Sequence, residues 1–206
     1  FFAFTLPKIR EANHKIRNER KTAKRISRSF FSDSDMTEED LSEIKRLRSK
    51  YKVNPQSNIQ DALEALIIKV DEVPASLVLA QSANESGWGT SRFATQAKNM
   101  FGIWCFRKGC GITPLKRAAG EIYEVAKYNS IQESVEAYML NINSHRAYQD
   151  LRNIRSALRA DNGHLSGMTL AEGLETYSAR GLKYVEEIKQ LIRTNKLQRF
   201  NSEDKA

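Results

Sequence analysis

A single glutamate stands at the end of a long run of small and apolar residues. The run begins at Pro74 and continues without a charge to Glu85, which is followed by Ser-Gly-Trp88-Gly. Proline is favoured in the first turn of a helix and glycine ends one, so this stretch predicts a buried helix over 74–85. A carboxyl group at the rim of such a helix, beside Trp88, favours its protonated form and can act as a general acid. The alternative is a carboxylate held by backbone amides, with Trp88 in the core.

The other reactive side chains do not form a second catalytic pattern. His145 follows Ser144, but a lone histidine is more typical of a structural residue than of a catalytic one, and the sequence shows no motif of a Ser or Cys nucleophile with its base. Cys105 and Cys110 are the only cysteines, and the glycine-containing segment between them favours a disulfide over free thiols. No second Cys/His pair lies at ligand spacing, so we expect no metal and no cofactor.

The hydrophobic patterns predict a mostly helical chain that positions Glu85. Aromatic and β-branched residues at 100–106 and 121–128, separated by glycines and a proline, predict one short antiparallel hairpin. The fold class is therefore α+β, predominantly helical, with a small β-hairpin lobe. The predicted helices cover 5–29, 37–52, 59–70, 74–85, 91–98, 130–143, 147–160, 169–177 and 182–195, the second opened by a capping box at Thr37.

A turn-rich joint at 52–58 divides the chain into unequal parts. We expect an N-terminal helical extension over 1–55, a catalytic domain over 56–200 and a tail over 201–206. The formal net charge of +8 is concentrated in the extension, where residues 8–28 hold nine lysines and arginines against two glutamates. This basic helix either contacts an anionic envelope surface or presents a solvated face. No nucleic-acid-binding motif accompanies the charge, and no apolar run is long enough to span a membrane.

The strings 80–89, Ser91-Arg-Phe-Ala and Lys98-Asn-Met-Phe-Gly-Ile-Trp104 resemble the glucosaminidases of glycoside hydrolase family 73. The closer likeness is to the Bax-type members of Gram-negative bacteria, and it extends from Phe1 to Tyr177. The resemblance implies a lysozyme-like fold with a cleft between the helical lobe and the hairpin lobe. It also implies export to the periplasm or beyond, the glycan of bacterial peptidoglycan as substrate, and Glu85 as the catalytic acid.

The second carboxylate of such enzymes is absent from its usual place. Family members carry a glutamate just after a threonine on the first strand of the lobe, whereas Thr113 is followed by proline. Glu121 and Glu124 are the nearest candidates, and only one of them is expected to face the cleft. We favour Glu124, because Tyr123 and Val125 would then share the packed face. The alternatives are Glu121, assistance by the substrate's acetamido group, and surface positions for both glutamates.

Aromatic residues complete the site that the resemblance implies. Tyr177 is also an expected catalytic residue, because it corresponds to a tyrosine that faces the catalytic acid and whose hydroxyl orients the acetamido group or water. The acid that usually follows this tyrosine is missing here. Trp88, Phe101, Trp104 and Tyr138 are the expected sugar-binding residues. For Phe101 and Tyr138 the alternative is ordinary core packing.

The sequence thus predicts a monomeric endo-β-N-acetylglucosaminidase that acts on peptidoglycan strands in the periplasm or outside the cell. Two alternatives stay open. One is a lytic transglycosylase, which needs a single glutamate, and the other is a non-catalytic peptidoglycan-binding module.

Overall fold

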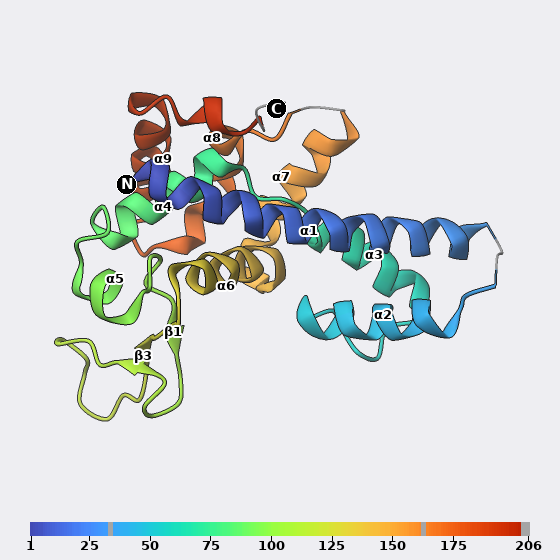
Figure 1. The fold of residues 1–206 in the computed structure, drawn as a ribbon, viewed down its shortest axis with the longest axis horizontal. Coiled ribbons are helices and arrows are strands. Elements are labelled where there is room, and N and C mark those ends of the chain that lie inside the picture. The colour runs from blue at the N-terminus through green and yellow to red at the C-terminus, as the bar shows by residue number, and fades with distance from the viewer. Residues whose placement is uncertain (33–34, 162–163, 203–206) are drawn as a thin grey trace.

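One long helix, α1 (Phe2–Phe31), runs along most of the length of the molecule (Figure 1). The computed structural model of the 206-residue chain describes residues 1–32, 35–161 and 164–202. The predicted helix over 5–29 is confirmed and is longer by a few residues at both ends. Its buried positions lie along one face, as expected for a helix packed against a domain: Thr5, Leu6, Ile9, Ala12, Asn13, Ile16, Ala23 and Ile26.

Several of the remaining helices begin at a residue whose side chain caps the first turn. Thr37 accepts a hydrogen bond from the Asp40 backbone N–H at 3.1 Å, and the Asp40 carboxylate accepts from the Thr37 N–H, so the predicted capping box is present. The helices are α2 (Glu38–Lys50), α3 (Ile59–Lys69), α4 (Ala75–Ser86), α5 (Arg92–Ala97), α6 (Ile131–Ser144), α7 (Gln149–Ala160), α8 (Gly167–Leu170) and α9 (Leu182–Thr194). Short 3₁₀ helices are η1 (Arg146–Tyr148), η2 (Ala171–Tyr177) and η3 (Leu197–Phe200).

The β-lobe has three strands where the sequence predicted a two-stranded hairpin. Strand β3 (Glu124–Ala126) lies between β1 (Trp104–Cys105) and β2 (Gly111–Ile112), and both pairings are antiparallel. A side chain at Gly111 would place its Cβ 1.9 Å from the Val125 carbonyl oxygen, so only glycine fits this position. The same glycine made the segment resemble a turn, which is why β2 was missed. The α+β, predominantly helical class with its small β-lobe and N-terminal helical extension is confirmed.

Helix α4 is buried in the hydrophobic core. Helices α1, α8 and α9 and the 3₁₀ helix η3 pack against it, and nearly all of its side chains are buried. A helix surrounded on all sides has no solvent-facing stripe, which explains why its sequence is uniformly small and apolar. This packing brings its last turn, with Glu85, to the edge of the core.

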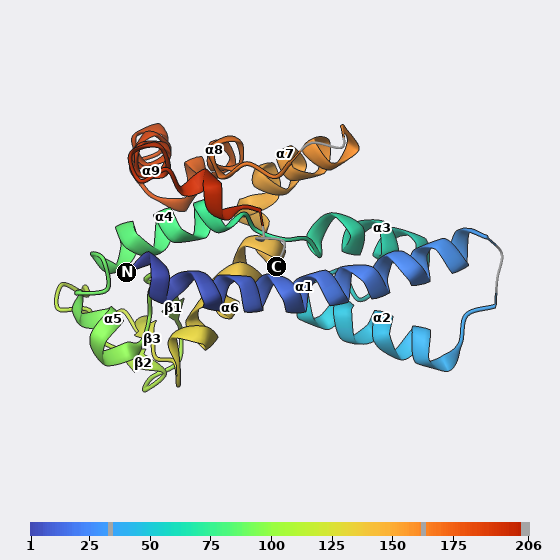
Figure 2. The same cartoon turned by 45° about the horizontal axis from the view of Figure 1, so that its top comes forward.

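Helix α1 belongs to the same hydrophobic core as the rest of the chain. It contacts α3, α4 and α6, with α2 and α3 near one of its ends and the β-lobe with α5 near the other (Figures 1 and 2). Four of its basic side chains form ion pairs inside the molecule: Lys15–Glu136, Arg17–Glu72, Arg20–Asp71 and Arg25–Asp40. Much of the charge that suggested an envelope contact therefore joins α1 to its neighbours. Contact with an envelope surface stays a prediction.

Two further observations concern the limits of the chain. Within the described ranges, no helix has both the length and the apolar character that crossing a bilayer requires. Of the predicted tail over 201–206, residues 203–206 lie outside the described part of the chain.

Candidate active site

A tight turn fixes the position of Glu85 at the end of α4. Gly87, Trp88 and Gly89 have φ angles of 55°, 59° and 82°, so three successive residues are left-handed. The conformation suits the two glycines and strains the tryptophan. The Ser86 hydroxyl accepts the Gly89 N–H at 2.7 Å and donates to a carbonyl one turn earlier. The carboxyl of Glu85 is therefore carried by a rigid, partly buried backbone.

One oxygen of Glu85 is held by a chain of buried polar groups. The Tyr184 hydroxyl donates to Glu85 Oε1 at 2.7 Å, and the Asn84 amide donates to the same oxygen at 3.3 Å. Gln81 donates from Nε2 to the Tyr184 hydroxyl at 2.9 Å, and the Tyr138 hydroxyl donates to Gln81 Oε1. Oε2 of Glu85 has no hydrogen bond to any residue that the structure describes. A carboxyl held on one side and open on the other can give a proton to a bound substrate.

Tyr177 lies next to this chain but does not bond Glu85. Its ring stacks on the Tyr184 ring with centroids 5.2 Å apart, and its hydroxyl donates to the Phe101 carbonyl at 3.3 Å. The tyrosine that bonds the glutamate is Tyr184, which the sequence analysis missed. Its signal was a tyrosine on the apolar face of the last predicted helix, in line with Ile188.

Burial keeps these tyrosines neutral. Burial raises the pKa of Tyr138, Tyr177 and Tyr184 far above the ordinary value, and nearby negative charge, including that of Glu85, raises each further. Their hydroxyls therefore remain hydrogen-bond donors over the whole physiological pH range. They can orient a carboxyl group or a substrate, but they cannot serve as bases.

Two of the expected sugar-binding residues are core residues. Phe101 is 3% exposed and Tyr138 is 1% exposed, and their rings stack on each other with centroids 4.0 Å apart and an interplanar angle of 13°. Neither ring has a free face for a pyranose. The prediction for these two residues is therefore corrected to a structural role, which follows from their burial in the hydrophobic core.

The two tryptophans, in contrast, are open to solvent. Trp88 is 46% exposed and contacts the rings of Phe1 and Phe2 at centroid distances of 5.8 and 5.3 Å. Trp104 on β1 is 53% exposed, and its ring stacks on Tyr123 at 4.4 Å and 10°. Among the residues predicted from the sequence, these are the ones that offer aromatic faces to a ligand.

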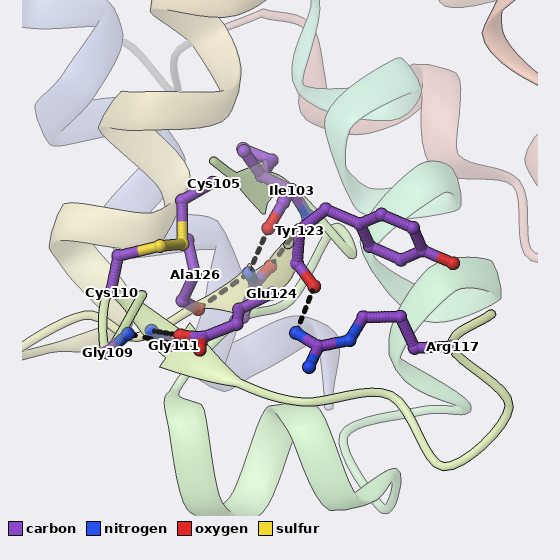
Figure 3. The surroundings of a disulfide bond; sticks show 10 residues. Ile103, Cys105, Gly109, Cys110, Gly111, Arg117, Tyr123, Glu124 and Ala126 are labelled. Carbon is purple, nitrogen blue, oxygen red and sulfur yellow. Dashed lines mark hydrogen bonds between the residues drawn. A yellow bond between two sulfur atoms is a disulfide. The ribbon is translucent and has the colours of Figure 1, made fainter. Parts of the chain in front are cut away.

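Glu124 lies in the β-lobe with both oxygens engaged (Figure 3). It is buried, and its carboxylate accepts the backbone N–H groups of Gly109 at 3.0 Å and Gly111 at 2.8 Å. These two amides lower the pKa of Glu124, because they stabilise the ionised form. The group therefore holds a loop, and this arrangement speaks against the predicted role as second catalytic carboxylate. Glu121 is exposed in the segment before β3.

The loop that Glu124 holds is closed by a disulfide. Cys105 and Cys110 are bonded to each other, as predicted. Together with Glu124 they form a group of potential metal ligands whose atoms lie within 4.8 Å of one another in the described part of the chain. Sulfur atoms bonded to each other are not thiolates, so in its oxidised form this group stabilises the loop and does not offer thiolate ligands to a metal. His145 is structural too, because its Nδ1 accepts the Ala147 N–H at the start of η1.

The chain is similar to known proteins over most of its length. A family model described as Glucosaminidase, mannosyl-glycoprotein endo-beta-N-acetylglucosaminidase, matches residues 59–197. Protein bax of Escherichia coli (strain K12) is 30% identical over 185 residues, which cover 89% of this chain and 64% of that protein. The catalytic domain of the autolysin Auto from Listeria monocytogenes is 17% identical and has a TM-score of 0.48, with 84% of this chain and 93% of that chain covered. The chain thus spans slightly less than two thirds of the length of the bax protein.

Proposed function

This chain belongs to the glucosaminidase family, and on that premise we propose that it is an endo-β-N-acetylglucosaminidase of peptidoglycan with Glu85 as general acid. The observation that carries the proposal is the arrangement of Glu85. It is the one carboxyl at the end of buried helix α4, it is held through Oε1 by Tyr184, and its Oε2 has no bond to a described residue. The residues that precede and follow it also carry the resemblance to the family.

The proposed reaction begins with proton transfer from Glu85 to the oxygen that leaves the anomeric carbon. The bond between that oxygen and the carbon breaks as an oxocarbenium-like transition state develops. Since both oxygens of Glu124 accept backbone N–H groups, we assign the assistance at the opposite face to the acetamido group of the substrate. Its carbonyl oxygen attacks the anomeric carbon, and water then opens the cyclic intermediate while Glu85 takes a proton back. Glu121 is the alternative source of assistance.

We assign sugar stacking to Trp88 and Trp104, since both expose aromatic faces. Action on peptidoglycan places the protein outside the cytoplasm, where disulfides such as Cys105–Cys110 persist.

A lytic transglycosylase is the second candidate, and the engagement of Glu124 favours it. Such an enzyme needs one glutamate, which first protonates the leaving oxygen and then accepts a proton from the sugar. It releases an anhydro-sugar instead of consuming water. The two candidates differ in their products and not in their general acid.

Digestion of purified peptidoglycan tests both. Wild type, Glu85→Gln and a control, Glu64→Gln on an exposed position of α3, would be compared, with the products reduced by borohydride and analysed by mass spectrometry. We expect reduced N-acetylglucosamine ends with wild type and the control, and a rate roughly 10²- to 10⁴-fold lower with Glu85→Gln. Anhydro-muramic ends would instead identify a transglycosylase. Binding to the sacculus without products from any variant would indicate a binding module.

A further inference from the structure

We propose that Tyr184 is the positioning residue of Glu85: it holds Oε1 and leaves Oε2 as the oxygen that carries the proton to the sugar. This inference rests on the proposed function. It gives a role to a residue of α9, which lies outside the sequence motif around Glu85.

The direction of the hydrogen bonds supports this assignment. A tyrosine hydroxyl has one proton, and Gln81 Nε2 donates to the oxygen of Tyr184, so the Tyr184 proton is left to point at Glu85. The orientation of the Gln81 amide is fixed in turn, because its Oε1 accepts from the Tyr138 hydroxyl. Three donors therefore follow one another from α6 through α4 to α9 and end on the carboxyl.

Burial fixes each hydrogen bond of this chain of donors to a single partner. Gln81, Tyr138 and Tyr184 are all fully or almost fully buried, so water does not compete for their polar atoms. Each of the side-chain groups named here has its partner, and a satisfied buried network resists rearrangement. The Tyr177 ring stacked on Tyr184 limits its movement further.

The arrangement suits a group that must lose a proton. A protonated carboxyl carries its proton on one oxygen, and the oxygen that accepts the Tyr184 O–H is the less suitable one. The proton is therefore favoured on Oε2, which has no bond to a described residue. Once the proton has moved to the leaving group, the same O–H stabilises the carboxylate that remains.

The titratable groups that surround Glu85 do not change charge in the alkaline part of the assay range. Tyr138 on α6, Tyr148 on η1, Tyr177 on η2 and Tyr184 on α9 all sense its charge, and burial keeps them neutral in the assay range. The Arg180 guanidinium lies 5.4 Å from the centre of the Tyr184 ring. His145 contacts Tyr148, and burial lowers its pKa, so it titrates on the acidic side.

The test is the pH dependence of kcat/KM on soluble peptidoglycan fragments for wild type and Tyr184→Phe. Loss of a hydrogen bond to an ionised carboxylate disfavours that form, so the glutamate keeps its proton to higher pH. We expect the alkaline limb to move upward by about one pH unit. We also expect kcat at the optimum to fall roughly ten- to a hundredfold, with KM little changed, because the carboxyl is less well oriented.

Tyr51→Phe is the matched control. The Tyr51 hydroxyl donates to Glu19 at 2.6 Å in the helical extension, so this variant loses the same kind of buried bond far along the chain from Glu85. If the role of Tyr184 is purely structural, both variants should have a lower melting temperature than wild type, and both should have the same pH profile of kcat/KM as wild type. That result would overturn the proposal. If Tyr184→Phe does not fold, Gln81→Met is the second variant. It should move the alkaline limb of the pH profile upward by less than one pH unit, and an alkaline limb identical to that of wild type would overturn the proposal.

Failure of the proposed function gives a different result. If folded wild type has no activity, the titration of Glu85 followed by carboxyl ¹³C NMR still tests the contact. A higher titration midpoint in Tyr184→Phe than in wild type supports it, and identical midpoints refute it.

Discussion

Removal of residues 1–55 tests whether the family domain is stable by itself. The family model covers 59–197, yet α1 contributes to the same core as α4 and α6. We therefore expect a chain of residues 56–206 not to fold into a native domain. The helical extension would then be a structural part of the catalytic unit and not a separable appendage.

The size of the effect follows from what α1 buries. Leu6, Ile9 and Ile16 are buried in the shared core, and each contributes roughly 2 kcal/mol. The Asn13 side chain exchanges two hydrogen bonds with the backbone of Val73, at 2.9 and 3.1 Å, for about 1 kcal/mol each. The loss is about 8 kcal/mol, which is comparable to the whole stability of a typical domain of about 5–15 kcal/mol.

Circular dichroism and urea unfolding of the full chain and of residues 56–206 would measure this loss. Within the full chain, Ile9→Ala should cost about 2–5 kcal/mol, since Ile9 is 0% exposed. Leu41→Ala, at a position 46% exposed on α2, is the control and should cost less than about 1 kcal/mol. Cooperative unfolding of 56–206 with a free energy within about 2 kcal/mol of the full chain would refute the reasoning.

Three further predictions concern single contacts. Burial alone would raise the pKa of Asp71, but the hydrogen-bonded Arg159 and nearby guanidinium groups hold it below the ordinary value. Asp71→Asn should therefore lower the free energy of unfolding in urea by about 3–5 kcal/mol at pH 7. The difference from wild type should be much smaller at pH 2, because the stability that ionised Asp71 contributes is lost as the pH falls through its depressed pKa. Replacing Cys105 and Cys110 by serine should cost about 2 kcal/mol in thermal unfolding, as expected for a loop this short, and an unchanged melting temperature would contradict this. Trp104→Ala should weaken sacculus binding roughly five- to tenfold in a pull-down series, and equal binding would remove Trp104 from the sugar site.

The helix that carries Glu85 was predictable because its signals are local. Its proline, its uncharged apolar run and its terminal glycine each act within a few residues, and α4 begins and ends where they indicate. The third strand and the tyrosine on the glutamate were not predictable in this way. Strand β2 exists because Gly111 can approach Val125, and Tyr184 reaches Glu85 from a helix that begins almost a hundred residues later. Contacts of that kind depend on how distant elements pack.

The contrast between Glu85 and Glu124 shows why the sequence alone does not settle the prediction of Glu124 as the second carboxylate. Both are single glutamates beside aromatic residues, and residue type and spacing do not distinguish them. Their acceptor atoms do. Glu124 accepts backbone N–H groups of the disulfide loop with both oxygens, so its ionised form is stabilised and its carboxylate is held as part of that loop. Glu85 bonds the protein through one oxygen only, and that asymmetry is what a proton donor requires. If Glu124→Gln proved as inactive as Glu85→Gln while the β-lobe kept its fold, this distinction would be wrong.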